Sequence, residues 1–375
     1  MPELHAAARA SLPGIPVIPT EPTRSVIQRM PPEFSAQASL LGTRPEGHRL
    51  SSGVAMCTCN GGRFLIPQLE SIVAQTRKPD HIVVSDDLST DDTWTKLQDW
   101  ASTVRAAHGI RVTLFQNVVR LGVTKNFEQA IRALDTDIVF LADQDDVWLP
   151  NKIEVLVARF ADPATMLAHS DATLIDENGK DLGKSLFEAL RLSDREKELV
   201  QRQHFFEIYC RRNLVTGTTA AFRRELLGMA LPFPEDWIHD EWLAACAAAE
   251  SKVAMLTDKL TEYRQHGTNA IGVPVTAVSR LTLYAMRVAR TPRDEHLRYK
   301  LRRLDALRER LVNANAGDRD KLALLDEARA HFERRIRFGR SPASRVTSIL
   351  REYKASGYHR FADGFAGMVR DVIHL

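Results

Sequence analysis

Three aspartates crowd one short segment of the chain, at Asp143, Asp145 and Asp146. They follow the apolar run 138–142, which predicts a buried strand, so the carboxylates fall where the chain leaves a sheet. Mg²⁺ and Mn²⁺ prefer oxygen ligands and often take only one or two carboxylates, completing their shell with water and phosphate oxygens. A cation held here would neutralise a departing diphosphate.

These acids also have a simpler interpretation. Aspartate favours turns and helix N-termini, and Asp146 could cap a helix that starts near Pro150. However, three carboxylates within four residues repel one another unless a cation offsets their charge. That repulsion favours the metal site over the cap.

A second acidic segment, 85–93, follows the apolar residues 82–84. One of its acids could accept hydrogen bonds from a base or a ribose, as acids at strand ends do in dinucleotide-binding folds. Alternatively, Ser89 or Thr90 caps the helix that begins near Trp94. We expect both roles to be filled, by different residues.

The phosphate-binding glycine motifs are missing from the sequence. It contains neither Gly-x-Gly-x-x-Gly nor the complete Gly-x-x-x-x-Gly-Lys-Ser/Thr loop, which argues against a redox dinucleotide enzyme and a kinase-like ATPase. Asn60-Gly61-Gly62 predicts a turn whose backbone could approach a ligand closely.

Short apolar runs alternate with helical stretches from residue 54 onward. This order predicts βαβ units, hence an α/β fold with a mostly parallel sheet and helices on both faces. Ligands bind such sheets beyond the carboxyl ends of the strands, so the polar segments 58–63, 85–93 and 143–146 should converge. The predicted strands are 54–57, 82–84, 111–115 and 138–142, and the predicted helices are 64–75, 93–105 and 124–134.

Farther along, the pattern is less regular. It predicts a helix at 152–160, a strand at 166–169, a hairpin around 177–179, a charged loop to about 203, a strand at 215–223 and a helix at 241–249. The domain prediction is a flexible proline-rich leader at 1–50, with a helix considered at 24–30, a catalytic domain at 51–274 and a helical extension at 275–375 that breaks at 339–344.

Bulk composition excludes some classes of protein. The net charge of +3, from 51 basic and 48 acidic residues, is too small to predict nucleic-acid binding. No apolar run is long enough to span a bilayer, and no signal-peptide core precedes the first prolines. Cys57, Cys59, Cys210 and Cys246 lack metal-ligand spacing and are expected to be reduced thiols. We therefore predict a cytoplasmic protein.

At this point the sequence resembles a family 2 glycosyltransferase with the GT-A fold, over about 54–272. The ending Tyr263 to Asn269, with Asp-Gln-Asp-Asp-Val-Trp at 143–148, is similar to the rhamnosyltransferase-like branch that builds bacterial surface polysaccharides. The segments that carry the resemblance are 54–60, Gln75-Thr76 and Pro79 before 82–91, 117–126, 141–152, 217–220, 239–242 and 263–269.

The resemblance implies a Rossmann-like GT-A catalytic domain and an inverting, metal-dependent glycosyltransferase of the hexosyltransferase class. The donor would be a dTDP- or UDP-sugar, with rhamnose as one candidate, and the acceptor a saccharide or lipid-linked hydroxyl. The implied residues are Asp240 as catalytic base, Cys57, Thr58, Asn60, Asp87, Lys125, Asp143 and Gln144 at the donor, Asp145 and His266 at Mg²⁺ or Mn²⁺, and Thr218, Glu241 and Trp242 on the acceptor side.

Taken alone, two of these residues have plainer interpretations. Asp240 could be a helix N-cap before Trp242, and His266 a hydrogen-bonded loop histidine. Two other functions also stay open. A nucleotidyltransferase uses acid-bound metal as well, although its lysine-bearing glycine loop is missing here, and a non-catalytic sugar-nucleotide-binding or scaffold protein would not need Asp240.

The basic tail has several candidate roles. Arg302, Arg303, Arg308 and Arg310 fall on one predicted helix. That helix could present a solvated face, pack on the catalytic domain, form a homo-oligomer or contact anionic lipid at the inner face of the membrane.

Overall fold

The computed structural model describes residues 49–250, 252–267, 291–339, 341–362 and 364–373. The predicted leader and the helix considered at 24–30 lie outside the described residues. So does the start of the predicted extension. No helix in the described ranges is long and apolar enough to cross a membrane.

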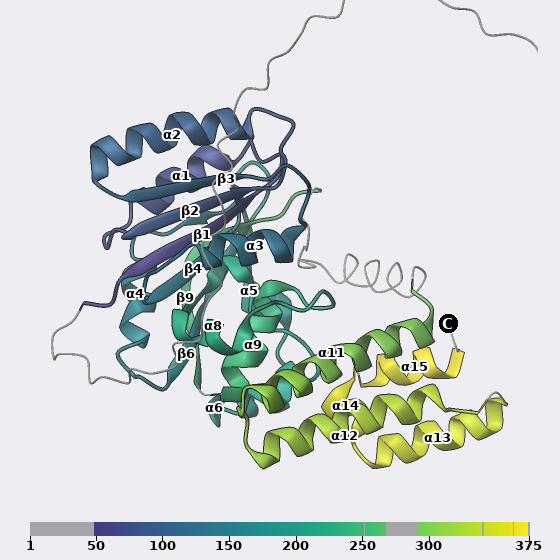
Figure 1. The fold of residues 1–375 in the computed structure, drawn as a ribbon. Coiled ribbons are helices and arrows are strands. Elements are labelled where there is room, and N and C mark those ends of the chain that lie inside the picture. The colour runs from purple at the N-terminus through teal and green to yellow at the C-terminus, as the bar shows by residue number, and fades with distance from the viewer. Residues whose placement is uncertain (1–48, 251, 268–290, 340, 363, 374–375) are drawn as a thin grey trace, which may run out of the picture. The chain divides into compact units, whose positions relative to one another are not determined.

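A nine-stranded mixed sheet forms the centre of the fold (Figure 1). Its order is β3-β2-β1-β4-β8-β6-β9-β5, and β7 pairs with β6. The pairs β3-β2, β2-β1 and β1-β4 are parallel, as the alternating sequence pattern predicted. The strands are β1 (Ser52–Thr58), β2 (His81–Asp86), β3 (Arg111–Gln116), β4 (Ile138–Ala142), β5 (Val147–Trp148), β6 (Thr165–Ile175), β7 (Asp181–Ser185), β8 (Ala220–Arg223) and β9 (Lys252–Arg264).

Helices cover both faces of the parallel half of the sheet. Side chains alternate along a strand, so Val54 packs with α1, α2 and α4 while its neighbour Ala55 packs with α3 and α9. Figure 1 shows α3 on the opposite side of the sheet from α1 and α2. These helices are α1 (Leu65–Val73), α2 (Thr93–His108), α3 (Val123–Arg132), α4 (Lys152–Arg159) and α9 (His239–Glu250).

The predicted charged loop to about residue 203 is wrong. That stretch contains β7 and two short helices, α5 (Leu186–Leu190) and α6 (Asp194–Gln201), followed by α7 (Phe205–Tyr209). Ser185 with Glu188 and Ser193 with Glu196 form capping boxes that start α5 and α6. These caps satisfy the first backbone amides, which compensates for the weak apolar pattern.

Two strands also differ from the prediction. The 215–223 segment becomes a 3₁₀ turn, Gly217–Thr219, before the short β8, and a further helix, α8 (Leu227–Ala230), follows. The 13-residue β9 was not predicted. Its exposed middle carries Asp258 and Lys259, which interrupt the period-two pattern by which strands are recognised.

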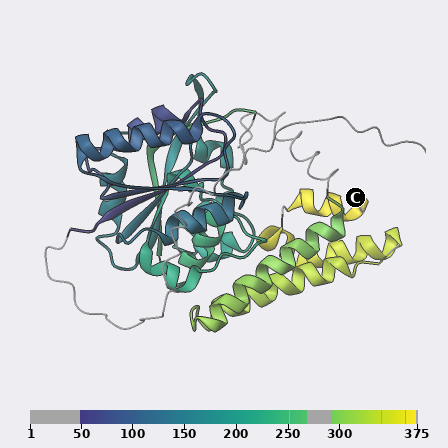
Figure 2. The same cartoon turned by 45° about the horizontal axis from the view of Figure 1, so that its top comes forward.

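The C-terminal extension is helical, as predicted, and breaks between Ile336 and Pro342. Figure 2 shows its long helices, green to yellow, running alongside one another. Leu304, Leu307 and Phe332 belong to the same apolar cluster as the sheet residues Val139 and Phe222. The helices are α11 (Arg293–Asn313), α12 (Arg319–Ile336), α13 (Pro342–Lys354), α14 (Gly357–Phe361) and α15 (Phe365–Ile373).

The four arginines considered for lipid contact bind protein groups instead. Arg302 pairs with Asp236 at 2.8 Å, and Arg303 pairs with Glu241 at 2.5 Å. Arg310 donates to the carbonyls of Met229 and Pro232, and Arg308 pairs with Asp326 of α12. Three of the four therefore join α11 to the catalytic domain, which leaves this face poorly suited to a membrane.

A buried ion-pair network lies inside the extension. The carboxylate of Asp371 is fully buried and accepts from Arg293 and Arg335, both at 2.7 Å, and from the Tyr358 hydroxyl. Burial raises the pKa of Asp371, but Arg335 and Arg293 outweigh it and hold that pKa below its usual value. The network therefore depends on an ionised Asp371.

We predict that Asp371→Ala lowers the free energy of unfolding by about 3–5 kcal/mol, because it leaves the buried guanidinium of Arg335 without a counter-charge and that of Arg293 with only the half-exposed Asp294. Chemical denaturation followed by circular dichroism measures the change. Asp305→Ala is the matched control, since it removes a half-exposed partner of Arg329 and should cost about 1 kcal/mol or less. Equal losses in both variants would contradict the prediction.

Candidate functional site

The three polar segments meet at the carboxyl ends of β1, β2 and β4, as predicted. The side-chain amide of Gln144, after β4, binds the backbone of Cys59, after β1, through two hydrogen bonds of 2.8 and 3.2 Å. The Thr58 hydroxyl donates to Asp86 of β2 at 2.8 Å. The backbone amide of Asn60 donates to Ser89 at 2.8 Å. Gln144 thus joins the segments that follow β1 and β4, and Thr58 joins the ends of β1 and β2.

The Asn60-Gly61-Gly62 turn fits tightly against this arrangement. A Cβ at Gly61 would lie 2.1 Å from Oε1 of Gln144, so only glycine leaves room for the Gln144 side chain. The carbonyl of Gly61 accepts from the amides of Phe64 and Leu65, where α1 begins. The turn is confirmed, and its glycine serves a packing contact.

Asp87 holds the loop that follows β3. One of its oxygens accepts from Nδ2 of Asn117 at 2.9 Å and from the amide of Leu121 at 2.7 Å, and the other accepts from the amide of Gly122 at 2.9 Å. The carboxylate is 6% exposed. Asp87 therefore fixes the conformation of this loop. A nucleobase that binds to Asp87 would have to share a carboxylate that already accepts three hydrogen bonds.

Neither predicted cap is formed as expected. At the start of α2 it is Asp91, rather than Ser89 or Thr90, that accepts from the amide of Thr93 at 3.0 Å. Asp146 does not cap α4 either, because its Oδ1 accepts from the amide of Arg264 at 2.9 Å. The acidic turn after β4 is thus tied to the end of β9.

Asp145 and His266, predicted as metal ligands, are adjacent. Nε2 of His266 lies 2.7 Å from Oδ2 of Asp145, and both side chains are about nine-tenths buried. The His266 ring stacks on Phe64 with centroids 4.9 Å apart. A carboxylate oxygen and an imidazole nitrogen suit Mn²⁺. No group of three or more His, Cys, Asp or Glu side chains in the described ranges is arranged to hold a metal ion.

The remaining acids of the turn are buried beside a lysine. Lys152 is fully buried, donates to the carbonyl of Thr218 and, at 2.9 Å, to the Thr261 hydroxyl, and lies 3.8 Å from the centre of the Trp148 ring. Burial raises the pKa of Asp146 to about 7, with a further contribution from Asp145. Burial lowers the pKa of Lys152, although Asp146 and Asp143 oppose that shift.

Asp240 lies in the first turn of α9. Its two oxygens accept from the amides of Gly217, at 2.9 Å, and Glu241, at 2.6 Å. Burial raises the pKa of Asp240 to about 7, and the charge of Glu241 adds to the rise. The same carboxylate raises the pKa of Asp143, after burial and the charges of Asp146 and Asp145. Asp240 is therefore close to the β4 turn.

The thiol of Cys57, in β1, lies near acids that follow β2 and β4. Burial raises the pKa of Cys57, and the charges of Asp143 and Asp87 add to that shift. The thiol of Cys57 therefore lies near both Asp87 and Asp143, and Asp240 lies near Asp143. All four cysteines are free thiols, as predicted.

Several predicted site residues are engaged in packing. The prediction that Trp242 contacts the acceptor is wrong. Trp242 is fully buried, and its indole donates to the carbonyl of Ala230, so it presents no surface to an acceptor. Thr218 is also fully buried, and Glu241 is paired with Arg303. Lys125 bonds Glu128 at 2.8 Å and the carbonyl of Phe233 at 2.7 Å.

Two residues around the acidic turn were not identified from the sequence. Lys152 was interpreted only as the start of a helix and as the last residue of a segment that carries the resemblance. Arg264, which donates to the carbonyl of Asp145 at 2.8 Å, was interpreted only as part of the terminal motif. When a basic residue lies six or more positions along the chain from an acidic turn, the sequence does not indicate that the two are close in space. Tertiary packing alone brings them under the carboxylates.

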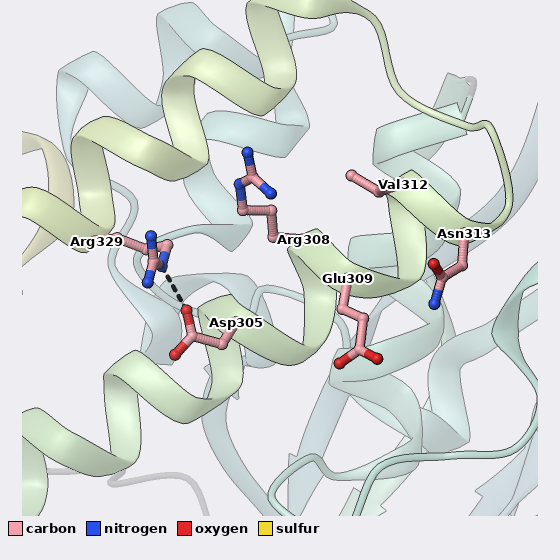
Figure 3. A pocket seen from close by; sticks show the side chains of 6 residues that line it. All are labelled: Asp305, Arg308, Glu309, Val312, Asn313 and Arg329. Atoms are coloured by element: carbon pink, nitrogen blue, oxygen red, sulfur yellow. Dashed lines mark hydrogen bonds and ion pairs between the residues drawn. The ribbon is translucent and has the colours of Figure 1, made fainter.

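A surface pocket lies away from this cluster, on the extension (Figure 3). It is lined by α11 residues and by Arg329 of α12, which forms an ion pair with Asp305. Figure 3 shows Arg329 bonded to Asp305, whereas Arg308 pairs with Asp326, which does not line the pocket. None of the predicted site residues lines the pocket.

Comparisons with known proteins agree with this geometry. Residues 53–228 match the profile of the family described as glycosyl transferase family 2. The chain is 29% identical over 224 residues to an uncharacterized glycosyltransferase of Nostoc sp. (strain PCC 7120), a match that covers 58% of this chain and 65% of that protein. It is 24% identical over 229 residues to the dTDP-rhamnosyl transferase RfbG of Shigella flexneri, covering 59% and 75% of the two chains.

One solved structure extends the comparison to the fold. The chain matches the crystal structure of S. aureus TarS 1-349 in complex with UDP-GlcNAc with a TM-score of 0.51 and 16% identity, over 86% of this chain and 82% of that one. The likeness confirms the predicted GT-A fold. The profile match shows that residues 53–228 form a glycosyl transferase family 2 domain.

We predict that Lys152→Met lowers the free energy of unfolding by about 3–5 kcal/mol at pH 8, because it leaves buried carboxylates without their cation. The loss is smaller at pH 6, where Asp146, with its pKa of about 7, is protonated. Denaturant titrations at the two pH values measure this difference.

The controls separate charge from packing. Adding Asp146→Asn to Lys152→Met should recover part of the loss. Lys96→Met removes a lysine that is 35% exposed and paired with Asp92, and should cost about 1 kcal/mol or less at either pH. A loss in Lys152→Met that is independent of pH would show that the lysine stabilises only by packing.

Proposed function

We propose that this chain transfers a sugar from a nucleoside-diphosphate donor to an acceptor hydroxyl, with inversion at the anomeric carbon. One observation carries the proposal: Asp240 accepts from the amide of Gly217, and the carbonyl of the next residue, Thr218, accepts from Lys152, which is buried beside the acidic turn at the carboxyl end of β4. A proton acceptor and a diphosphate-binding turn on the same edge of the sheet are the two components that a direct displacement requires.

Asp240 is proposed as the general base. With a pKa of about 7, its carboxylate is ionised in half of the molecules at neutral pH, and a base is most effective when its pKa is close to the working pH. The amides of Gly217 and Glu241 fix the orientation of the carboxylate. As the acceptor oxygen bonds to the anomeric carbon, Asp240 takes the hydroxyl proton and the bond to the diphosphate breaks.

Asp145 and His266 are proposed to hold a divalent cation. Mg²⁺ and Mn²⁺ accept one or two protein ligands and complete their shell with phosphate and water oxygens, which suits this pair. When bound, the cation would offset the charge of the leaving diphosphate. Phe64 stacks on His266 and Arg264 binds the backbone of Asp145, so both side chains are held in place.

The donor is proposed to lie over the ends of β1 and β2. Cys57, Asn60 and Asp87 lie at that edge of the sheet, and Asp143 is near Cys57. Gln144 and Thr58 position the loops, whereas Lys125 acts at a distance by fixing α3 to Phe233. The Asp-Gln-Asp-Asp-Val-Trp motif and the similarity to a dTDP-rhamnosyl transferase favour dTDP-rhamnose, and a saccharide or lipid-linked acceptor of bacterial surface polysaccharide synthesis.

Asp240→Asn is expected to lower kcat by about 10²- to 10⁴-fold while donor affinity stays unchanged, because the variant loses the proton acceptor only. In the wild-type chain, kcat/KM should rise with pH and level off above about 7, as Asp240 loses its proton. Steady-state transfer assays from pH 5.5 to 9 and calorimetric titration of the donor measure the two effects.

Asp236→Asn is the matched control, because it alters a surface aspartate that is paired with Arg302 and close in sequence. Its kcat should stay within about twofold of wild type. Full turnover in Asp240→Asn would exclude Asp240 as the base. A non-catalytic binding protein would bind the donor and show no transfer in either form.

Removal of divalent cations with a chelator should abolish transfer, and Mn²⁺ should restore it. His266→Ala is expected to weaken Mn²⁺ binding about tenfold or more, because one of two protein ligands is lost. Electron paramagnetic resonance of free Mn²⁺ measures affinity without turnover. His204→Ala, at an exposed histidine, should leave affinity unchanged. Equal Mn²⁺ affinity in His266→Ala would contradict the assignment.

A further inference from the structure

Helix α15 is amphipathic in the reverse sense of a normal surface helix. Its buried face carries Arg370 and Asp371, and Arg370 donates to the carbonyl of Thr291 at 2.7 Å. Its outward face carries large apolar side chains, which globular proteins normally turn inward. These are Phe365, 75% exposed, Val369, 40%, Val372, 47%, and Ile373, 51%.

Helix α13 presents a second exposed apolar stripe. Val346, Leu350 and Tyr353 are spaced four and three residues apart, which places them on one face, and they are 44–50% exposed. The two helices are in contact, since Nη1 of Arg345 donates to the carbonyl of Val372 at 3.1 Å. We call the exposed apolar residues of both helices the α13–α15 surface.

Among the described residues of α13 and α15, the exposed charges have a single sign. Arg351 and Lys354 of α13 are exposed and make no ion pair with any residue that the structure describes. The two acids described in 341–362 and 364–373 are buried: Glu352 pairs with His331 and Arg334, and Asp371 with Arg293 and Arg335. The surface is therefore apolar with a cationic edge.

The apolar side chains and the cationic edge together favour one kind of binding partner for this surface. A symmetric contact between two copies would place Arg351 and Lys354 near their own equivalents, without acids in the described part of these helices to offset them. A bilayer containing anionic lipid offers an apolar phase for the aliphatic and aromatic side chains and negative headgroups for the cations.

We propose that the α13–α15 surface docks on an anionic lipid bilayer and holds the chain at the membrane interface. Phe365, Val369 and Leu350 enter the headgroup boundary, while Arg351 and Lys354 contact lipid phosphates. This peripheral contact differs from the one considered for the α11 arginines, which bind protein groups. It is independent of the proposed sugar transfer, because vesicle binding needs no donor and no turnover.

Vesicle sedimentation of the full chain tests the proposal. We expect binding to phosphatidylcholine vesicles that contain phosphatidylglycerol, weakened by high salt, and little binding to phosphatidylcholine alone. The double variant Phe365→Ser/Val369→Ser should weaken binding about tenfold or more, and so should Leu350→Ser combined with Arg351→Glu and Lys354→Glu. All these side chains are exposed, so the fold should be unchanged by circular dichroism.

Two controls match the variants. Val312→Ser alters an equally exposed valine, at 51%, on α11, and Arg159→Glu alters an exposed arginine of α4, and both should bind vesicles like wild type. Absence of wild-type binding, or unchanged binding in both multiple variants, would overturn the proposal. So would a change from dimer to monomer in Phe365→Ser/Val369→Ser, measured by light scattering, with vesicle binding retained.

Discussion

The burial of several carboxylates at the turn after β4 is the constraint on which the rest of the site depends. Burial raises the pKa of Asp143 and raises that of Asp146 to about 7, so the ionised form of these two acids is costly here. Lys152 beneath the turn and the backbone amide of Arg264 offset part of this cost. A bound divalent cation would supply further positive charge.

The fold is arranged around that requirement. The parallel strands β1, β2 and β4 bring their carboxyl ends together, and Gln144 fixes the distance between two of the loops. Antiparallel β8 and the long β9 then return the chain, so that Gly217, Asp240 and His266 reach the same edge. Helix α11 supports this side through Arg303 and its contact with Glu241.

The sequence predicted the parallel half of the sheet because apolar runs there end in acidic turns, a pattern that local periodicity reveals. It also brought Asp145 and His266 into one group through the resemblance. It could not predict that Trp242 is buried or that Lys152 lies under the acids, because both depend on packing between distant segments. Asp258 and Lys259 interrupt the alternating pattern of β9, so the strand was not recognised. Capping boxes start α5 and α6 where the composition suggested a loop.

A crystal structure with a nucleoside diphosphate and Mn²⁺ tests the central claim most directly. The account predicts anomalous density for Mn²⁺ between Asp145, His266 and the diphosphate, with the nucleoside over the ends of β1 and β2 and Asp240 facing the diphosphate from the acceptor side. Density for the nucleotide elsewhere, for example in the pocket lined by α11 and α12, with Asp145 and His266 still bonded to each other, would contradict it.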